Sequence, residues 1–222
     1  FMGNSKLTEN QLRRMPVYLN YLKRISDKGV DFISCQEIAD ANFLNQEQVR
    51  KDIALVSSIN GVPNKGRDVK LLIRDIEKVL GIDNENDAII VGIGSLGTAL
   101  CNYNGFRSYG LRIVAGFDHN ESLIGKVING IPIYNLIDLK KINEKLNVKI
   151  AIMTVPALAA KEVANILINN GIEAIWNFAP IKLDLGDKVI ITNMDMASSL
   201  ASLSHKLYIK HHENKGDKNE WD

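Results

Sequence analysis

The sequence predicts an α/β protein with two parts, an N-terminal winged helix-turn-helix domain and a C-terminal doubly wound Rossmann domain. Two capped helical segments joined by a short turn, between residues 34 and 56, predict the first part. A glycine-rich turn at residues 92–97, followed by a regular alternation of apolar strands and helices, predicts the second. The chain has 222 residues, of which 45% are hydrophobic, so one large or two small packed domains are expected.

A polar linker at residues 83–86 separates the two parts, because it follows an amphipathic helix that ends at Gly81. We therefore expect a winged-helix domain over residues 1–82 and a Rossmann domain over residues 83–194. A C-terminal dimerisation helix over residues 195–210 and a mobile tail over residues 211–222 complete the predicted organisation.

Three capping pairs mark the beginnings of helices in the first part. The first pair precedes an apolar stripe over residues 8–28, within which Pro16 is expected to kink or restart the helix. The other two begin a pair of helices joined by a turn around residues 42–45, which is the arrangement of a helix-turn-helix. The pairs are Thr8 with Gln11, Ser34 with Glu37, and Asn45 with Gln48.

The second helix of this pair carries the candidate DNA contacts. Its apolar positions Val49, Ile53 and Val56 form an inward face, so the polar side chains of its N-terminal half face solvent. Such side chains suit base edges and phosphates, although a merely solvated helix face explains the spacing equally well. The candidate residues are Gln46, Gln48, Arg50 and Lys51.

Residues 57–68 are rich in turn signals and predict a short hairpin in the position of a wing. Lys65 and Arg67 are expected at its tip, within reach of a DNA backbone or minor groove. An ordinary polar loop is the alternative. Residues 1–81 hold 13 Lys and Arg against 10 Asp and Glu, a small positive excess that permits contact with DNA.

The glycine turn has the spacing of a dinucleotide-binding fingerprint, and each glycine has a steric role. Gly92 permits a sharp turn, Gly94 lets the backbone approach a pyrophosphate, and Gly97 lets the helix pack closely on the strand. The helix that begins at Ser95 and Leu96 presents unpaired N–H groups and a positive dipole end to a phosphate. A purely structural turn between strand and helix is the alternative.

Asp118 strengthens the fingerprint, because it ends a second apolar run about 20 residues beyond the last glycine, where an acidic residue binds a ribose hydroxyl. A carboxylate repels a 2′-phosphate, so Asp118 favours NAD(H) over NADP(H). Ligands of such sheets lie at the carboxyl ends of the strands, and later apolar runs end near residues 155 and 178. The further residues that we expect to contact the cofactor there are Thr154, Val155, Pro156, Asn177 and Phe178.

Composition argues against several other classes of protein. Cys35 and Cys101 do not have the spacing of a metal site or of a redox motif, and we expect His211 and His212 to be exposed to solvent. No metal site is therefore predicted. No apolar run approaches the roughly 20 residues of a membrane span, so we expect no membrane contact and a reducing, cytoplasmic location. The formal net charge of +1 gives no nucleic-acid signature for the chain as a whole.

The last helix, from Asp195 to about Ile209, follows the completed sheet and carries Leu200, Leu203 and Leu207 on one side. An amphipathic helix with no strand to return to often packs on a second subunit, so a homodimer is expected.

Seven stretches of the chain together carry a family resemblance, namely Arg14-Met15-Pro16-Val17-Tyr18-Leu19, Gln48-Val49-Arg50-Lys51-Asp52-Ile53, residues 91–100, Gly116-Phe117-Asp118, Thr154-Val155-Pro156-Ala157, residues 171–180 and Met194-Asp195-Met196-Ala197. In this order they resemble the Rex family of redox-sensing transcriptional repressors. The resemblance implies a homodimer with winged-helix heads, NAD(H)-binding Rossmann domains, and terminal helices swapped between subunits. It also implies that NAD+ and NADH compete for one site, and that NADH favours a closed dimer that no longer matches the operator DNA.

The resemblance further implies that Tyr103 lies near the nicotinamide and that Asp195 and Met196 of the partner's terminal helix close over it. From the residues alone, Tyr103 is equally a core residue and Asp195 a helix cap. Two features depart from the family pattern. Asn20 stands where the family usually has an arginine that can pair with the acid of the terminal helix, and the wing lacks the usual aromatic and glycine-rich segment.

The leading functional hypothesis is a repressor that leaves operator DNA when NADH replaces NAD+. No catalytic residue is predicted and the protein is not expected to be an enzyme, because no His or Lys is placed as a proton donor beside the nicotinamide. Two alternatives remain, an NAD(H)-binding regulator that has lost or altered DNA binding and a small NAD-dependent oxidoreductase.

Overall fold

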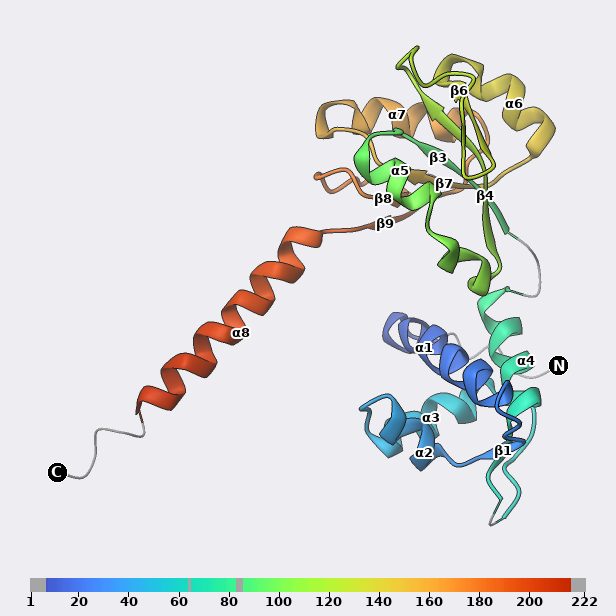
Figure 1. Ribbon diagram of the computed structural model, residues 1–222, viewed down its shortest axis with the longest axis vertical. Helices are drawn as coiled ribbons and strands as arrows, with labels where there is room; N and C mark the ends of the chain where they lie inside the picture. Colours follow the sequence, from blue (N-terminus) through green and yellow to red (C-terminus); the bar gives the residue numbers. More distant parts are fainter. Residues whose placement is uncertain (1–6, 64, 83–85, 217–222) are drawn as a thin grey trace. The chain divides into compact units, whose positions relative to one another are not determined.

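The computed structural model describes residues 7–63, 65–82 and 86–216 of the chain (Figure 1). These residues form two compact units. The first is drawn from the chain up to Asn86 together with Gly105–Leu111, and the second from Asp87–Asn104 together with the chain from Arg112 onwards.

The first unit is a small helical bundle closed by a two-stranded sheet. Its helices are α1 (Glu9–Ser26), α2 (Cys35–Ala41), α3 (Gln46–Val56) and α4 (Val69–Leu80). Strand β1 (Phe32–Ile33) pairs antiparallel with β2 (Arg67–Asp68), which ties the chain before α2 to the chain before α4. The fully buried core side chains come from all four helices and include Met15, Tyr18, Leu22, Ile38, Val49, Ile53, Leu72 and Ile76.

The capping residues predicted for these helices are confirmed with one difference. Thr8 with Gln11 and Ser34 with Glu37 form complete capping boxes, in which each side chain bonds the backbone N–H of the other. Asn45 caps α3 by accepting from the backbone N–H groups of its first turn, so only half of the third predicted box forms.

Helix α1 continues through Pro16, from Glu9 to Ser26, so of the two predicted effects of the proline the restart of the helix does not occur. The proline removes only one N–H from the helix, and the flanking residues Met15, Tyr18 and Leu19 are buried in the core. Packing of this apolar stripe therefore outweighs the local cost of the proline.

The second unit is a doubly wound α/β sandwich, which confirms the predicted fold class. Its sheet has the order β5-β6-β4-β3-β7-β8-β9, and without β5 this is the Rossmann order. The parallel pairs include β3 with β7, β4 with β6, β7 with β8, and β8 with β9. The strands are β3 (Asn86–Val91), β4 (Leu111–Asp118), β5 (Val127–Ile128), β6 (Ile131–Asn135), β7 (Ile150–Met153), β8 (Ala174–Asn177) and β9 (Ile190–Asn193).

Strand β5 is an addition that the predicted alternation of parallel strands did not contain. It pairs antiparallel with β6 through a two-residue turn at Asn129 and Gly130, both with positive φ, 49° and 79°. An Asn-Gly pair between apolar residues is a strong hairpin signal, because both positions of the tight turn need φ above zero. The edge strand β5 thus runs antiparallel to its neighbour β6.

The helices of this unit that precede its last element are α5 (Ser95–Cys101), α6 (Leu139–Leu146) and α7 (Ala157–Asn169), with short 3-10 turns at Leu136–Asp138 and Gly186–Lys188. A further 3-10 turn, Asn104–Tyr109, follows α5 and belongs to the first unit from Gly105 onwards. Helices α6 and α7 pack on one face of the sheet, where their buried residues join those of β3, β4 and β7 in one apolar cluster. The sheet places the carboxyl ends of β3, β4, β7 and β8 along one edge, where the candidate site lies.

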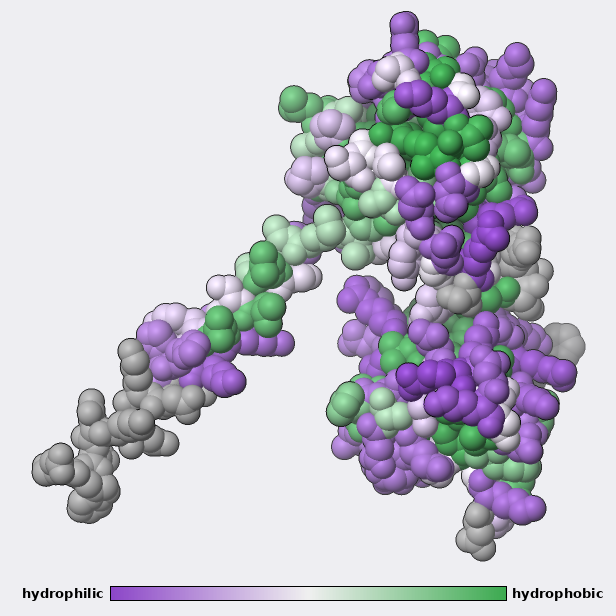
Figure 2. Space-filling view, in the orientation of Figure 1, coloured by the Kyte–Doolittle hydropathy of each residue, from purple (hydrophilic) through white to green (hydrophobic). Residues whose placement is uncertain are grey.

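Helix α8 (Met196–Gly216) is the last element, and every side chain described on it, up to His212, is exposed. Its first half carries apolar side chains at the surface (Figure 2), among them Leu200 and Leu203, which are 67% and 62% exposed. Of the predicted mobile tail, residues 211–216 continue this helix, and residues 217–222 lie outside the described part. None of the helices in the described ranges combines the length and apolar character needed to cross a bilayer.

Candidate cofactor pocket and DNA-facing helix

A cavity of about 760 Å³ opens at the carboxyl ends of β3, β4, β7 and β8 in the second unit. This volume lies within the range of small-molecule and cofactor sites. Its wall combines the glycine loop, the end of β4 and the turn that leads into α7. The lining residues are Val91, Gly92, Ile93, Gly94, Leu96, Asp118, His119, Asn120, Leu123, Leu136, Thr154, Val155, Pro156, Ala159, Val163, Phe178 and Pro180.

The three glycines of the loop have the steric roles that their spacing predicts. Gly92 has φ of +92°, and a Cβ there would lie 2.9 Å from the carbonyl oxygen of Thr154. A Cβ on Gly97 would overlap the carbonyl oxygen of Gly92, so the start of α5 can approach the loop only with glycine at this position. Gly94, in contrast, has open space where its Cβ would be, which is the space that a ligand backbone contact requires.

Thr154, which follows β7, and Asp118, which ends β4, fix the shape of this loop from the two strands that flank β3. The hydroxyl of Thr154 donates to the carbonyl oxygen of Gly92 at 2.5 Å. The Asp118 carboxylate accepts from the backbone N–H of Ile93 at 2.6 Å and from that of Asn120 at 2.8 Å. A carboxylate can accept about four hydrogen bonds, so Asp118 braces the loop and still has acceptor capacity for a ligand hydroxyl.

The loop is suited to an anion. Gly94 is the N-cap of α5 and supplies no side-chain cap, so the N–H groups of the first helical turn must bond a ligand or water. These donors carry the positive end of the helix dipole into a cavity with mostly apolar walls, where an anion is stabilised more than in bulk water. The chemistry of this loop fits a pyrophosphate.

Eight of the predicted cofactor contacts line the cavity, and six do not. The eight are Gly92, Gly94, Leu96, Asp118, Thr154, Val155, Pro156 and Phe178. Ser95 is exposed at the start of α5, Gly97 is buried against the loop, and Tyr103 is 57% exposed after α5. Asp195 caps α8, since its carboxylate accepts from the N–H of Ser198 at 2.9 Å, and Met196 follows it.

The prediction for Asn177 needs correction, because its side chain is fully buried and held by protein groups. Its Nδ2 donates to the carbonyl oxygen of Ile181 and to Oδ1 of Asn193, and its Oδ1 accepts from the N–H of Ala179. Asn177 therefore fixes the loop after β8 rather than facing the cavity.

Several residues that line the cavity were not predicted from the sequence. The rule that ligands lie beyond strand ends could have found Leu136, which directly follows β6. It also covers His119 and Asn120, which follow Asp118. Ala159 and Val163 lie four residues apart on α7, and only the packing of that helix on the sheet brings them to the cavity.

Helix α3 presents the predicted DNA contacts on its exposed side. Val49 and Ile53 are buried as expected, while Gln46, Arg50 and Lys51 are exposed and Gln48 is half-buried. The guanidinium of Arg50 is already occupied, because its Nη2 donates to the carboxylate of Glu47 at 2.7 Å.

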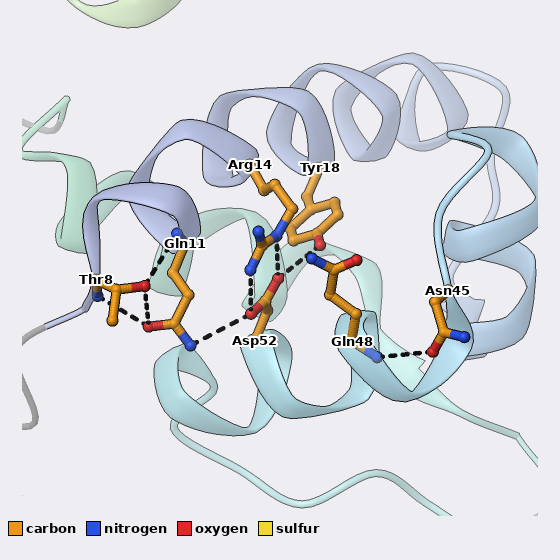
Figure 3. Close-up of polar contacts among 7 residues, drawn as sticks. All are labelled: Thr8, Gln11, Arg14, Tyr18, Asn45, Gln48 and Asp52. Atoms are coloured by element: carbon orange, nitrogen blue, oxygen red, sulfur yellow. Dashed lines mark hydrogen bonds and ion pairs between the residues drawn. The ribbon is translucent and has the colours of Figure 1, made fainter.

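Asp52, in contrast, is almost fully buried and joins α3 to α1 (Figure 3). Its carboxylate accepts from Nε and Nη2 of Arg14, at 2.7 and 3.0 Å, and from the hydroxyl of Tyr18 at 2.8 Å. Gln11 adds a longer contact at 3.4 Å. Asp52 follows Arg50 and Lys51 directly in the sequence, yet unlike these two exposed residues it is the polar centre of the first unit.

The Arg14–Asp52–Tyr18 cluster shifts the pKa values of its members. Burial raises the pKa of the Asp52 carboxyl, but the hydrogen bonds from Arg14 and Tyr18 together outweigh burial and leave that pKa below its usual value. Burial and the neighbouring carboxylate raise the pKa of Tyr18, and the bond to Asp52 raises that of Arg14. Asp52 is therefore ionised and Tyr18 neutral across the physiological range.

The wing is short and is held by its own side chains. Val62 and Gly66 form the only bridge of its turn within the described residues, and Gly66 has φ of +89°. Lys65 is exposed in this turn, with its ammonium 5.9 Å from the centre of the Phe32 ring. Arg67 was predicted at the tip but begins β2, half-buried, and its Nη1 donates to the carbonyl oxygen of Ile59 at 2.7 Å.

Comparisons with known proteins agree with this division of the chain. Residues 6–54 match the family model described as a putative DNA-binding protein N-terminus, and residues 83–181 match that of the CoA binding domain. The redox-sensing transcriptional repressor Rex of Treponema denticola is 43% identical over 192 residues, which are 86% of this chain and 91% of that protein. The chain belongs to the Rex family. The Rex protein of Desulforamulus reducens is 37% identical over 92% of this chain and 97% of its own.

Solved structures of the Rex family share the fold. The crystal structure of RSP, a Rex-family repressor, is 29% identical and covers 96% of this chain and 99% of its own, with a TM-score of 0.83. RSP in complex with NAD+ and operator DNA gives a TM-score of 0.86 over 98% of this chain. Rex proteins are redox-sensing transcriptional repressors, so the family predicted from the sequence motifs is confirmed.

The described part of the chain holds no group of three or more His, Cys, Asp or Glu side chains arranged to bind a metal ion. Cys101 is buried, and burial raises the pKa of its thiol, which lowers its reactivity.

Proposed function

We propose that this protein is a redox-sensing transcriptional repressor that binds operator DNA as a homodimer and is released when NADH replaces NAD+. The observation that carries the proposal is the combination, in one chain, of a glycine-loop pocket that fits a pyrophosphate with a capped helix that presents Gln46, Arg50 and Lys51. RSP, which shares the fold, has been crystallised with NAD+ and operator DNA and with NADH.

The cofactor is NAD(H) bound across the carboxyl ends of the sheet. The pyrophosphate lies on the N–H groups around Gly94, Ser95 and Leu96, and the adenosine ribose on Asp118. The nicotinamide lies toward Pro156 and Phe178 at the other side of the cavity. Tyr103, which does not line the cavity, is a nicotinamide contact that the resemblance to the Rex family implies. Asp118 disfavours NADP(H), because its carboxylate repels a 2′-phosphate.

The domains divide as winged helix, Rossmann domain and dimerisation helix, and the dimer forms through α8. Supporting this, α8 exposes Leu200, Leu203 and Leu207, an apolar face that a single chain leaves in water. In the dimer, Asp195 and Met196 of one subunit close over the cofactor of the other.

The protein acts as a sensor in the cytoplasm rather than as an enzyme. A cofactor shifts a two-state dimer only if it binds the two states with unequal affinity, and a 100-fold preference corresponds to about 2.7 kcal/mol. NAD+ and NADH differ by one hydride and the ring charge, so the contacts that discriminate between them lie at the nicotinamide.

A gel-shift titration on promoter DNA tests this function directly. Wild-type protein is titrated onto labelled duplex DNA without cofactor, with NAD+ and with NADH. We expect NADH alone to release the DNA, and NAD+ added in excess to restore binding. If neither pyridine nucleotide changes DNA binding, the sensor proposal fails.

The wing supports a second candidate, an NAD(H)-binding regulator with altered DNA binding, because Arg67 is bonded to Ile59 within the wing instead of standing free at its tip. Salt dependence separates the two. A functional DNA-binding head loses affinity for duplex DNA steeply as salt rises, whereas a head without that function binds weakly at every salt concentration.

A further inference from the structure

Glu47 is an acidic residue on a helix face where DNA-binding side chains are expected to be neutral or basic. It lies in the first turn of α3, one residue after Gln46 and one before Gln48. The side chain of Glu47 is 60% exposed, so it would lie beside the DNA wherever Gln46 and Arg50 do. The electrostatic field of the phosphates opposes a carboxylate in this position.

Glu47 does not stand alone, because Arg50 neutralises it from the next turn. Nε and Nη2 of Arg50 donate to Oε2 of Glu47 at 3.2 and 2.7 Å. Neither of these bonds uses Oε1. The bonds from Arg50 also hold the pKa of the Glu47 carboxyl below its usual value, so the group stays ionised at neutral pH.

An ionised carboxylate is a hydrogen-bond acceptor only, and this limits what it can contact in a major groove. Guanine O6 and N7 and thymine O4 are themselves acceptors, and adenine presents its N6 amino donor beside the N7 acceptor. Cytosine is the one base whose own major-groove edge presents an amino donor, N4, without an acceptor. A cytosine therefore satisfies Glu47, and a guanine or thymine at the same position repels it. The pairing with Arg50 keeps the net charge of the two side chains at zero next to the flanking phosphates.

We propose that Glu47 is a specificity-determining residue that selects a cytosine in the operator by accepting from its N4 amino group, with Arg50 as its positioning partner. The inference rests on the proposed DNA-binding function and adds to it the base that this helix reads. It also assigns Arg50 a double role, since an arginine committed to Glu47 contributes less to sequence-independent phosphate binding.

The test begins with the full-length wild-type chain and a random duplex library, from which bound sequences are selected. Affinities are then measured on the selected site, on variants with each base pair replaced, and on an unrelated duplex, at several salt concentrations. The same set is measured for Glu47→Gln and Glu47→Ala. Glu9→Gln is the matched control, because Glu9 forms a similarly exposed pair with Arg13 on α1 and the substitution removes the same charge.

We expect wild type to prefer cytosine at one position by about tenfold. Glu47→Gln should lose this preference or move it to adenine, which glutamine reads through N6 and N7. Glu47→Ala should lose it outright. Both should bind the unrelated duplex more tightly, with a log–log salt slope steeper by about 0.9, because Arg50 is freed for one phosphate.

Two results would overturn the inference while leaving the proposed function intact: unchanged base preferences in both Glu47 variants, or an equal change in Glu9→Gln. If wild type selects no sequence and binds no duplex in a salt-dependent way, the proposed function falls and this inference falls with it. Circular dichroism of each variant, expected to match wild type because the pair is exposed, verifies that the fold is retained.

Discussion

Asp52 shows how a single residue can connect the DNA-facing helix to the rest of the first unit. Its carboxylate is the acceptor for Arg14 and Tyr18, so its removal leaves a guanidinium and a hydroxyl in the core without that acceptor. The loss of one partner from a buried ion pair is costly, because the remaining charge keeps its desolvation penalty. We expect Asp52→Ala to destabilise the protein by about 3 kcal/mol.

Urea denaturation followed by circular dichroism measures this loss, with Glu9→Gln as the exposed control that should change little. An Asp52→Ala variant as stable as wild type would show that the cluster contributes nothing to the fold.

The same cluster makes stability depend on pH. The pKa of Asp52 is lower in the folded protein than in the unfolded chain, so its contribution is fully present above the unfolded value of about 3.9 and is lost as pH falls through the folded value. The stability difference between wild type and Asp52→Asn should therefore shrink below about pH 4. Urea midpoints of both proteins at pH 7, 5, 4 and 3 test this; a constant difference over the series would contradict it.

Gly92 and Gly94 separate folding from cofactor binding, because a methyl group meets different surroundings at the two positions. At Gly92 it would meet the carbonyl of Thr154 and require an unfavourable positive φ, whereas at Gly94 it would enter open space. We expect Gly92→Ala to lower stability by at least about 1 kcal/mol. Gly94→Ala should keep wild-type stability and weaken NAD+ and NADH binding more than tenfold, since the methyl group occupies the place of the pyrophosphate.

Thermal unfolding and isothermal titration calorimetry on both variants give the two readouts. Wild-type cofactor affinity in Gly94→Ala would argue that the loop is purely structural.

At the scale of elements, the wing shows how two basic residues two positions apart can serve different purposes. Lys65 is exposed in the turn, and Arg67 is bonded to the carbonyl of Ile59. We expect Lys65→Ala to leave stability unchanged and to reduce the log–log salt slope of DNA binding by about 0.9, the effect of one lost phosphate contact. Arg67→Ala should instead destabilise the first unit by about 1 kcal/mol, the usual loss for one hydrogen bond.

Paired measurements of urea midpoint and salt-dependent DNA affinity distinguish the two roles. Equal effects of the two substitutions on both quantities would contradict the assignment.

Helix α8 exposes an apolar face in the single chain. Leu200, Leu203 and Leu207 recur at helical spacing, and all are more than half exposed in the single chain. If a second copy covers them, Leu203→Glu places a charge in that interface. We expect this variant to elute as a monomer when light scattering follows size-exclusion chromatography, while wild type elutes as a dimer. A substitution on the charged part of the same helix, Lys210→Glu, is the control and should remain a dimer. Wild type that elutes as a monomer would refute the dimer.

At the scale of the whole molecule, one compact unit carries the proposed DNA-binding helix and the other carries the proposed cofactor pocket. The first unit presents α3, whose position is set by the bonds from Asp52 to α1, and the second unit holds the pocket. Residues Gly105–Leu111 belong by contact to the first unit although the chain on both sides of them belongs to the second. The chain therefore passes between the two units more than once. The linker predicted at residues 83–86 accounts for only one of these passages.

The sequence by itself determined those features that depend on neighbouring residues. The capping residues Thr8 and Ser34 could be assigned because a cap acts within one helical turn. The roles of Gly92 and Gly97 could be assigned because a strand–turn–helix unit imposes its steric limits locally. The alternation of apolar runs predicted a doubly wound parallel sheet, since parallel strands connected by helices have few allowed topologies.

Only the tertiary structure decided which polar side chains face a ligand and which hold the protein together. Asn177 was expected to contact the cofactor, and Asp52 directly follows two residues expected to contact DNA, yet both side chains are buried and bonded to protein groups. Arg67 is likewise bonded within the wing. Asp52 accepts from Arg14, 38 residues away, and Asn177 donates to Asn193, 16 residues away on another strand. The sequence around a polar residue looks the same whether its side chain binds a ligand or holds the protein together. The role depends on which distant groups the fold brings within hydrogen-bonding distance of that side chain.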